Sequence, residues 1–213
     1  MSGSEVGSGI DSLLAGYRRF RVTSWPDRRK VFESLAELGQ SPKAVVIACV
    51  DSRVDPAMIF DAGPGELLII RNIANLVPPY APDHAYHGTS AALEMGVRVM
   101  DIRHIIVLGH GMCGGVHALL TGAPESAQDF VAPWMQMAES ARAMAMRCTL
   151  PEERQQCCEE EVIKVSLANL MTFPWIGDRV AAGTLQLHGA WFAIHSGCLR
   201  MLTADGTFAR ADN

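Results

Sequence analysis

Hydrophobic positions in the middle of this chain form continuous runs instead of alternating with polar ones. The runs at about 44–49, 67–70 and 104–109 are too uniformly apolar for a sheet with one wet face, so they predict short, fully buried strands of a parallel sheet. Small and apolar residues recur at helical spacing over 89–101, which predicts a crossover helix between the last two of these strands. Strand and helix thus alternate, as in an α/β fold.

The N-terminal residues show a different, helical periodicity. Apolar residues recur at helical spacing before and after a break at Trp25-Pro26, and the pattern predicts two amphipathic helices. The residues that carry it are Ile10, Leu13, Leu14, Tyr17, Phe20, Val31, Phe32, Leu35 and Leu38. We therefore expect an N-terminal helical arm over residues 1–38.

The C-terminal part is predicted to continue with helices and to end in strands. Residues 126–147 are expected to be helical with a kink or restart at Pro133, and a long helix is expected from a Thr149 cap to Thr172. Residues 184–194 alternate as a strand, and 198–203 are expected to return beside it as an antiparallel partner. The predicted fold is a mostly parallel central sheet flanked by helices, with an antiparallel C-terminal strand addition.

Composition supports one globular domain. Hydrophobic residues make up 49% of the 213 positions and charged residues 19%, and no polar linker or repeat divides the chain. We expect a single domain over 1–213, made of the arm and an α/β core over 39–213. The formal net charge is −5, and basic residues cluster only at Arg18-Arg19 and Arg28-Arg29-Lys30, which argues against a nucleic-acid partner.

No stretch resembles a signal-peptide core, and nowhere do eighteen apolar residues run together. These features predict a cytoplasmic protein without a membrane partner. The six cysteines are accordingly expected to be metal ligands or buried thiols and not disulfides, because the cytosol keeps thiols reduced.

Two short motifs follow directly on two of the predicted strands. Cys49 ends the first strand, and His110 and Cys113 follow the third. Because the carboxyl ends of parallel strands meet at one edge of a sheet, these side chains are expected to converge. Two thiolates and an imidazole are zinc ligands, and three protein ligands with one open position are the arrangement of a catalytic zinc site. The sequence therefore predicts a Zn²⁺ cofactor held by these three residues.

Asp51 and Arg53 lie beside the first ligand and are close enough in sequence to pair. In one arrangement Arg53 holds the Asp51 carboxylate so that it accepts a hydrogen bond from the zinc-bound water and orients its attack. In the other, Asp51 leaves Arg53 and fills the fourth zinc position, which would inactivate the site. The sequence does not choose between these two states.

The substrate of such a site is expected to be small and electrophilic. The chain has no nucleotide-binding fingerprint, no Walker loop and no basic clamp for a phosphate, and carbon dioxide meets the remaining requirements. Backbone N–H groups at Gly114, where a helix is predicted to begin, could hold a developing oxyanion.

Taken together, these motifs resemble the β-class carbonic anhydrases, in their plant-like branch. The resemblance rests on the runs Gly39–Lys43, Cys49–Arg53, Arg71–Asn75, Val77–Tyr80, Gly109–Gly115, Ser166–Leu170 and Leu187–Gly189. It implies reversible hydration of carbon dioxide to bicarbonate by attack of a zinc-bound hydroxide, with Cys49, His110 and Cys113 as metal ligands. It also implies an Asp51–Arg53 dyad, Gln40 as a hydrogen-bond donor to substrate, and a homodimer or higher homo-oligomer with the arm laid over the partner.

Two other functions are compatible with the same motifs: hydrolysis of a sulfur analogue such as carbon disulfide or carbonyl sulfide, and a non-catalytic zinc or bicarbonate-sensing module in which Asp51 permanently fills the fourth position. The remaining cysteines, Cys148, Cys157, Cys158 and Cys198, are expected to be inert thiols. The remaining histidines, His84, His87, His104, His117, His188 and His195, are not expected to bind metal.

Overall fold

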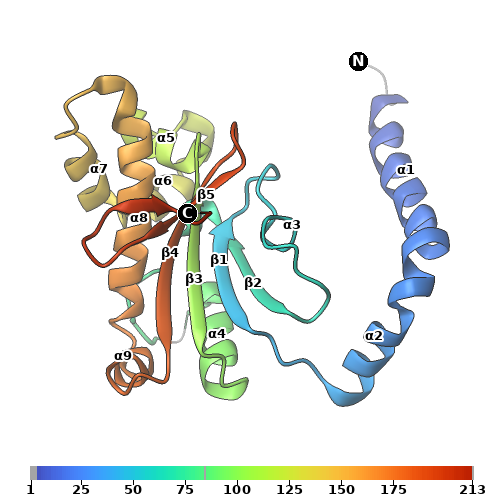
Figure 1. Cartoon of the computed structure of the whole chain (residues 1–213). Coiled ribbons are helices and arrows are strands. Elements are labelled where there is room, and N and C mark those ends of the chain that lie inside the picture. The colour runs from blue at the N-terminus through green and yellow to red at the C-terminus, as the bar shows by residue number, and fades with distance from the viewer. Residues whose placement is uncertain (1–3, 84, 213) are drawn as a thin grey trace. The chain divides into compact units, whose positions relative to one another are not determined.

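The computed structural model describes residues 4–83 and 85–212 and divides into two units, Met1–Gln40 and Ser41–Asn213 (Figure 1). The first unit is helical throughout: α1 (Ser4–Arg19), a π-helical turn η1 (Phe20–Ser24) and α2 (Trp25–Leu38). The predicted helices are confirmed, but the expected break at Trp25-Pro26 is wrong. Pro26 lies in the first turn of α2, where a helix has no partner for its N–H groups, so proline is tolerated.

The second unit is built on a sheet of six strands. They are β1 (Ala44–Cys49), β2 (Leu67–Asn72), β3 (His104–His110), β4 (Gln186–Ala193), β5 (Cys198–Leu202) and β6 (Phe208–Arg210). The order is β2-β1-β3-β4-β5-β6, parallel over the first four and antiparallel at β5 and β6. The α/β prediction with an antiparallel addition is confirmed, and β6 is a short edge strand that was not predicted.

Helices connect and cover the strands of this unit. They are α3 (Pro56–Ile59), α4 (Gly88–Glu94) with the π-helical η3 (Met95–Val99), α5 (Gly114–Thr121), α6 (Val131–Gln136), α7 (Glu139–Ala145), α8 (Arg154–Leu170) and α9 (Pro174–Ala181). Three short 3₁₀ turns are η2 (Ile73–Asn75), η4 (Glu125–Ala127) and η5 (Pro151–Glu153).

Two details of the predicted helices are wrong. The region 126–147 contains two helices, α6 and α7, and Pro133 sits in the first turn of α6 instead of at the break between them. Thr149 does not cap α8, because Pro151–Glu153 forms a 3₁₀ turn first and α8 then begins without a side-chain cap. Local sequence signals placed these helices but not their ends.

Both faces of β1 are buried, which explains its continuous apolar run, whereas the prediction of a fully buried strand at 67–70 is wrong, because β2 lies at the edge of the sheet and Ile69 is exposed. All six residues of β1 are buried. Since successive side chains of a strand point to opposite faces, Val45 and Ile47 pack with residues of α4, η3 and α8 on one side. Val46 and Ala48 pack on the other side with residues of α3 and of the antiparallel strands. This packing fixes the carboxyl ends of β1 and β3 side by side (Figure 1).

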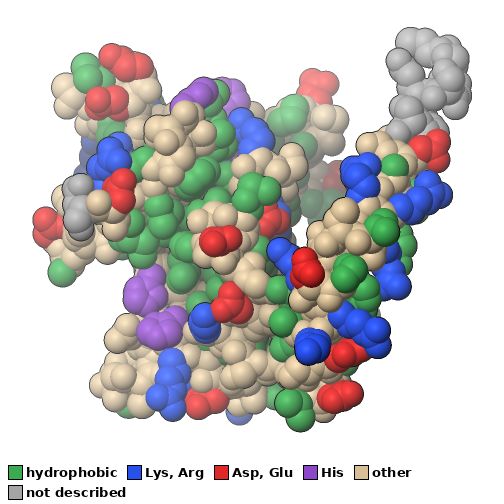
Figure 2. All heavy atoms as spheres, turned by 45° about the vertical axis from the view of Figure 1, so that its right-hand side comes forward, with side chains coloured by type: hydrophobic (Ala, Val, Ile, Leu, Met, Phe, Trp, Pro, Cys, Tyr) green, Lys and Arg blue, Asp and Glu red, His purple; other side chains and the backbone are tan. Residues whose placement is uncertain are grey.

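On the face of the described residues shown in Figure 2, hydrophobic side chains of the sheet-containing unit lie among interspersed acidic and basic ones. No helix within the described residues is both long enough and apolar enough to cross a membrane. The cytoplasmic location stays a prediction.

Candidate functional site

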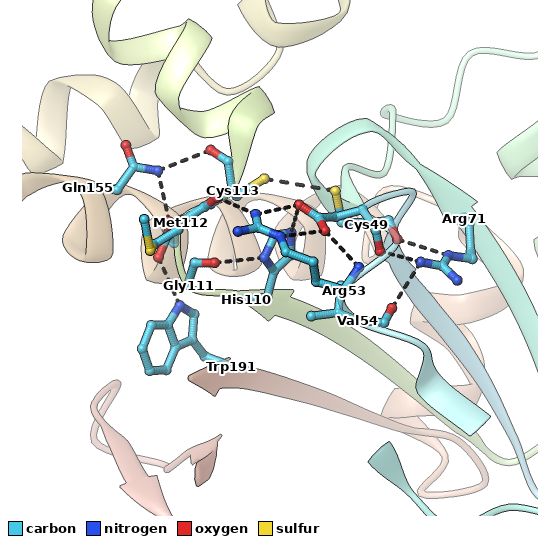
Figure 3. A network of polar contacts seen from close by, with 12 residues as sticks. Cys49, Arg53, Val54, Arg71, His110, Gly111, Met112, Cys113, Gln155 and Trp191 are labelled. Carbon is cyan, nitrogen blue, oxygen red and sulfur yellow. Dashed lines mark hydrogen bonds and ion pairs between the residues drawn. The ribbon is translucent and has the colours of Figure 1, made fainter. Parts of the chain in front are cut away.

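The structure brings the three predicted ligand side chains together at the carboxyl edge of the sheet (Figure 3). Cys49 is the last residue of β1, His110 the last of β3, and Cys113 directly precedes α5. Their ligand atoms all lie within 4.8 Å of one another. The two sulfurs are 3.9 Å apart, close to the separation of about 3.8 Å expected when two sulfurs each lie 2.3 Å from one tetrahedral zinc ion.

His110 is oriented as a metal-binding imidazole. Its Nδ1 lies 2.9 Å from the carbonyl oxygen of Gly111, which can only accept, so Nδ1 carries the proton. Nε2 then carries the lone pair, and it is buried without a hydrogen-bond partner. A buried polar atom left unpaired in this way is costly unless something binds it. An ion held by Nε2 and the two sulfurs would satisfy it.

The environment of the two cysteine thiols also favours binding of a cation between them. Hydrogen bonding from Cys113 is the main cause that lowers the pKa of Cys49, against the effect of burial, and His110 adds to it. The pKa of Cys113 is raised, because its thiol is hydrogen-bonded to Cys49 and buried. Two buried sulfurs in contact cannot both become thiolates unless a positive charge lies between them. The residues present therefore fit a zinc ion.

Arg71 shapes the loop that follows Cys49. Its guanidinium donates to the backbone carbonyl groups of Cys49 (3.0 Å), Asp51 (2.6 Å) and Val54 (2.9 Å) (Figure 3). Three carbonyl oxygens that would otherwise need water are satisfied by one side chain from β2. The turn that carries the first ligand is thus tied to the sheet by a side chain at the end of the second strand.

Asp51 and Arg53 form a bidentate pair beside the ligands. Oδ1 of Asp51 accepts from the backbone N and the Nε of Arg53 (both 2.9 Å), and Oδ2 accepts from Nη2 (2.7 Å). Arg53 Nη2 also donates to the carbonyl oxygen of Met112 (2.9 Å), so it links the two ligand loops. Oδ2 of Asp51 is 4.0 Å from Nε2 of His110. Of the two arrangements left open by the sequence, this one keeps Asp51 on Arg53.

Sequence reasoning missed two residues that hold the backbone of Cys113, Glu159 and Gln155, and a third, Trp191, that holds Glu159. Glu159 Oε1 accepts from the N–H of Cys113 (2.9 Å), and Gln155 Nε2 donates to the Cys113 carbonyl (3.1 Å) and to Glu159 (2.8 Å). The indole N–H of Trp191 donates to the other carboxylate oxygen of Glu159 (3.1 Å). Burial raises the pKa of Glu159, and the three donors oppose this rise. One buried carboxylate thus fixes the loop that carries a ligand.

A sequence signal for Glu159 existed. Gln155 and Glu159 precede Val162, Ile163 and Ser166 on the same face of α8, and this face is turned into the core. A charged residue in register with a buried apolar stripe needs a partner inside the protein. The pattern indicates a buried carboxylate, but it does not reveal that the partner lies 46 residues away.

Replacing Trp191 with phenylalanine is expected to weaken metal binding without disturbing the fold. The phenyl ring keeps most of the packing, but Glu159 loses one of its three donors, and a lost hydrogen bond to a charged group costs about 1.5–3 kcal/mol. We expect a lower zinc affinity, by up to about 10-fold, measured by competition with a chelator. Trp175→Phe is the matched control, because Trp175 packs in the core on α9. Equal weakening in both variants would contradict this role.

The other predicted site residues are less constrained by the structure. Gly114 is exposed and is the first residue of α5, and a Cβ there would meet nothing within 4 Å. Gln40 is exposed and is the last residue of the N-terminal unit. The contribution of each to substrate binding stays a prediction.

Among residues 4–83 and 85–212, Cys49, His110 and Cys113 are the His, Cys, Asp and Glu side chains that gather closely enough to hold one metal ion. Other histidines pair elsewhere: His87 contacts Asp83, and His104 contacts His188. His84, also predicted not to bind metal, lies outside the described residues.

The expectation that no cysteines pair is wrong for Cys148 and Cys157, which form a disulfide. The two lie nine residues apart in sequence, and the short loop between α7 and α8 folds them together. Cys158 and Cys198 are free thiols, as predicted.

Comparisons with known proteins agree with this geometry. The family model for carbonic anhydrase matches residues 44–199. The chain is 34% identical to β carbonic anhydrase 3 of Arabidopsis thaliana over 92% of this chain and 78% of that protein. It is 38% identical to a carbonic anhydrase of Pseudomonas aeruginosa over 93% of this chain and 89% of that protein.

Solved structures show the same fold. The β-carbonic anhydrase CcaA superposes with a TM-score of 0.88 at 32% identity, covering 97% of this chain and 93% of that one. One of the tetrameric β-carbonic anhydrases of Sordaria macrospora superposes with a TM-score of 0.81 at 25% identity, covering 95% of this chain and 99% of that one. The resemblance found in the sequence motifs is confirmed. The chain belongs to the β-carbonic anhydrase family of zinc-dependent lyases.

Proposed function

We propose that this chain catalyses the reversible hydration of carbon dioxide to bicarbonate and a proton, with Cys49, His110 and Cys113 as zinc ligands and the Asp51–Arg53 pair as the orienting group. Carbon dioxide hydration is the general activity of the family. The observation that carries the proposal is that Arg53 holds the Asp51 carboxylate beside the three ligand atoms. Among the residues that the structure describes, that position leaves the metal three protein ligands.

When bound, zinc acts as a Lewis acid that lowers the pKa of a coordinated water from about 15.7 to about 7. Asp51 decides the direction of the attacking lone pair. Hydrogen bonding from Arg53 holds the pKa of the Asp51 carboxyl well below its usual range, so at neutral pH it is ionised and can only accept hydrogen bonds. Its Oδ1 is occupied by two donors from Arg53, and the free capacity of Oδ2 faces the His110 side of the site. A nucleophile that donates its proton there turns its lone pair toward the substrate.

Arg53 has two roles in the proposed mechanism. It holds Asp51 away from the fourth metal position, and it ties the loop of Cys49 to that of Met112. The exposed first turn of α5, at Gly114, is proposed to hold the developing negative charge of the product, and Gln40 is proposed to donate to the substrate. A homodimer or higher assembly belongs to the proposal, supported by the similarity to the tetrameric Sordaria macrospora enzymes.

The test is stopped-flow hydration of carbon dioxide followed with a pH indicator, at pH 7 and near pH 8.5, on protein of measured zinc content. We expect activity that scales with zinc and disappears after removal of the metal by a chelator. The same preparations are assayed with carbon disulfide and carbonyl sulfide. Fully zinc-loaded protein that is inactive with carbon dioxide at both pH values would overturn the proposal. If that protein turned over carbon disulfide or carbonyl sulfide, the sulfur compound would be assigned as the substrate instead.

A further inference from the structure

The Cys148–Cys157 disulfide lies where it can act on the metal site. Cys148 follows α7, and Cys157 is in the first turn of α8. Both residues are half-buried, and they line a surface hollow of about 230 Å³ together with Met144, Arg147, Glu160 and Glu161. A small thiol reagent can therefore reach the bond from solvent.

On the side of α8 opposite the disulfide, two side chains support the backbone of Cys113. Gln155 and Glu159 lie two residues before and two residues after Cys157, and a helix rotates by about 100° per residue, so both point away from the disulfide. Gln155 donates to the carbonyl of Cys113 (Figure 3), and Glu159 accepts from its N–H. The start of α8 thus carries the disulfide on one side and the support of Cys113 on the other.

We propose that Cys148 and Cys157 form a reversible redox site, reduced by a dithiol partner, which sets how firmly the start of α8 holds Cys113. The effect on the metal rests on the proposed zinc site. The disulfide and its effect on α8 do not depend on that site. In a reducing compartment such a bond is normally transient and regulatory, which distinguishes it from the structural disulfides of secreted proteins.

The disulfide is the covalent restraint on the start of α8, and it acts together with the hydrogen bonds that Gln155 and Glu159 make to Cys113. The helix begins without a side-chain cap, directly after the 3₁₀ turn Pro151–Glu153. The N–H of Arg154 donates to the Pro151 carbonyl of that turn, but no side-chain cap adds to this bond, and a helix end without a cap frays more readily. The disulfide closes the chain from Cys148 to Cys157 into a ring and so restricts the frayed conformations. Once the bond is reduced, fraying can reach Gln155, which lies inside that ring.

The chemistry is a two-electron exchange. A thiolate of the dithiol attacks one sulfur of the Cys148–Cys157 bond, the S–S bond breaks, and a mixed disulfide forms while the other cysteine leaves as a thiolate. The second thiol of the partner then attacks its own bound sulfur and releases the second cysteine. The partner ends as a disulfide, and Cys148 and Cys157 each end as a thiol after taking up a proton.

The neighbouring thiols do not compete in this exchange. Cys158 is fully buried, and burial raises its pKa to about 12, so it stays a protonated thiol, which is a poor nucleophile. Cys198 lies on β5, beside the edge strand β6, and does not line the hollow around the disulfide. The exchange is therefore confined to one defined pair.

The experiment compares air-oxidised protein with protein reduced by dithiothreitol and desalted, both reloaded to the same zinc content. Mass spectrometry of non-reduced peptides is expected to find Cys148 linked to Cys157. Zinc transfer to a chromophoric chelator is expected to be about 3- to 10-fold faster from the reduced protein, which is less than the roughly 10- to 100-fold effect of removing a partner of a metal ligand outright, because reduction only loosens the partner. Cys148→Ser, outside α8, should transfer zinc at the reduced rate in both preparations, and Cys198→Ser should behave as the unmodified chain.

Amide hydrogen exchange gives a readout that does not need the metal. Exchange over residues 154–160 is expected to be faster after reduction. Free Cys148 and Cys157 in the oxidised protein, or exchange that is unchanged by reduction, would overturn the redox site. Faster exchange with equal zinc transfer would overturn its link to Cys113. Protein that binds no zinc in either state would refute the proposed function, and the exchange data would still decide the effect on α8.

Discussion

Replacing Cys113 with serine is expected to remove bound zinc and carbon dioxide hydration together. Serine is nearly the same size, but its hydroxyl is a far weaker zinc ligand than a thiolate. Loss of one strong ligand should lower the zinc affinity on the order of 10³-fold. Gln155 and Glu159 bind the backbone of residue 113 and not its side chain, so the loop should keep its shape. The measurements are zinc content by elemental analysis and hydration by stopped flow.

Cys198→Ser is the matched control for this variant. Cys198 is a free thiol on β5, and within the described part of the chain it belongs to no group that could hold a metal. It should keep a full complement of zinc and normal hydration. A Cys113→Ser variant that retained one zinc per chain and hydrated carbon dioxide at the original rate would refute the ligand assignment.

Replacing Asp51 with asparagine should leave zinc in place and lower the kcat/KM of hydration by about 10² or more, the usual contribution of a positioned acid or base. An amide cannot accept from Arg53 with both of its atoms, because its Nδ2 is a donor, so the bidentate pair is lost. Asp55→Asn is the control. Asp55 lies in the same segment and pairs with Arg71, and asparagine can still cap α3.

The effect of Asp51→Asn should be the same at pH 7 and pH 8.5. The Asp51 pKa is lowered by Arg53, so the stability that its charge contributes is present above the unfolded-state pKa near 3.9 and is lost only as the pH falls through the lower folded value. Asp51 therefore stays ionised over the whole assay range. A variant as active as the original chain, or one that loses its zinc, would contradict the orienting role.

The strands and the metal-ligand set could be predicted because both depend on short, continuous segments of the sequence. The apolar runs that became β1 and β3 end at Cys49 and His110, and the rule that parallel strands share a carboxyl edge was enough to bring Cys113 close to both. The state of Asp51 was not predictable, since a carboxylate can bind either Arg53 or a metal. The choice depends on donors that only the folded loop supplies, such as the backbone N–H of Arg53.

What the sequence did not reveal depends on contacts between distant segments. Glu159 supports Cys113 from a helix 46 residues further along, and Trp191 completes the arrangement from β4. The Cys148–Cys157 bond depends on how tightly the chain turns between α7 and α8. Such a turn has no hydrophobic period, so nothing in the sequence indicated that Cys148 and Cys157 pair, and the expectation of free thiols was wrong for these two residues.

The most direct test of the zinc site is an anomalous-difference map of crystals measured on both sides of the zinc absorption edge. We expect a single strong peak per chain that appears only above the edge, between the sulfurs of Cys49 and Cys113 and Nε2 of His110, with Asp51 still bound to Arg53. A map from zinc-supplemented protein with no peak among these three atoms would contradict the central claim.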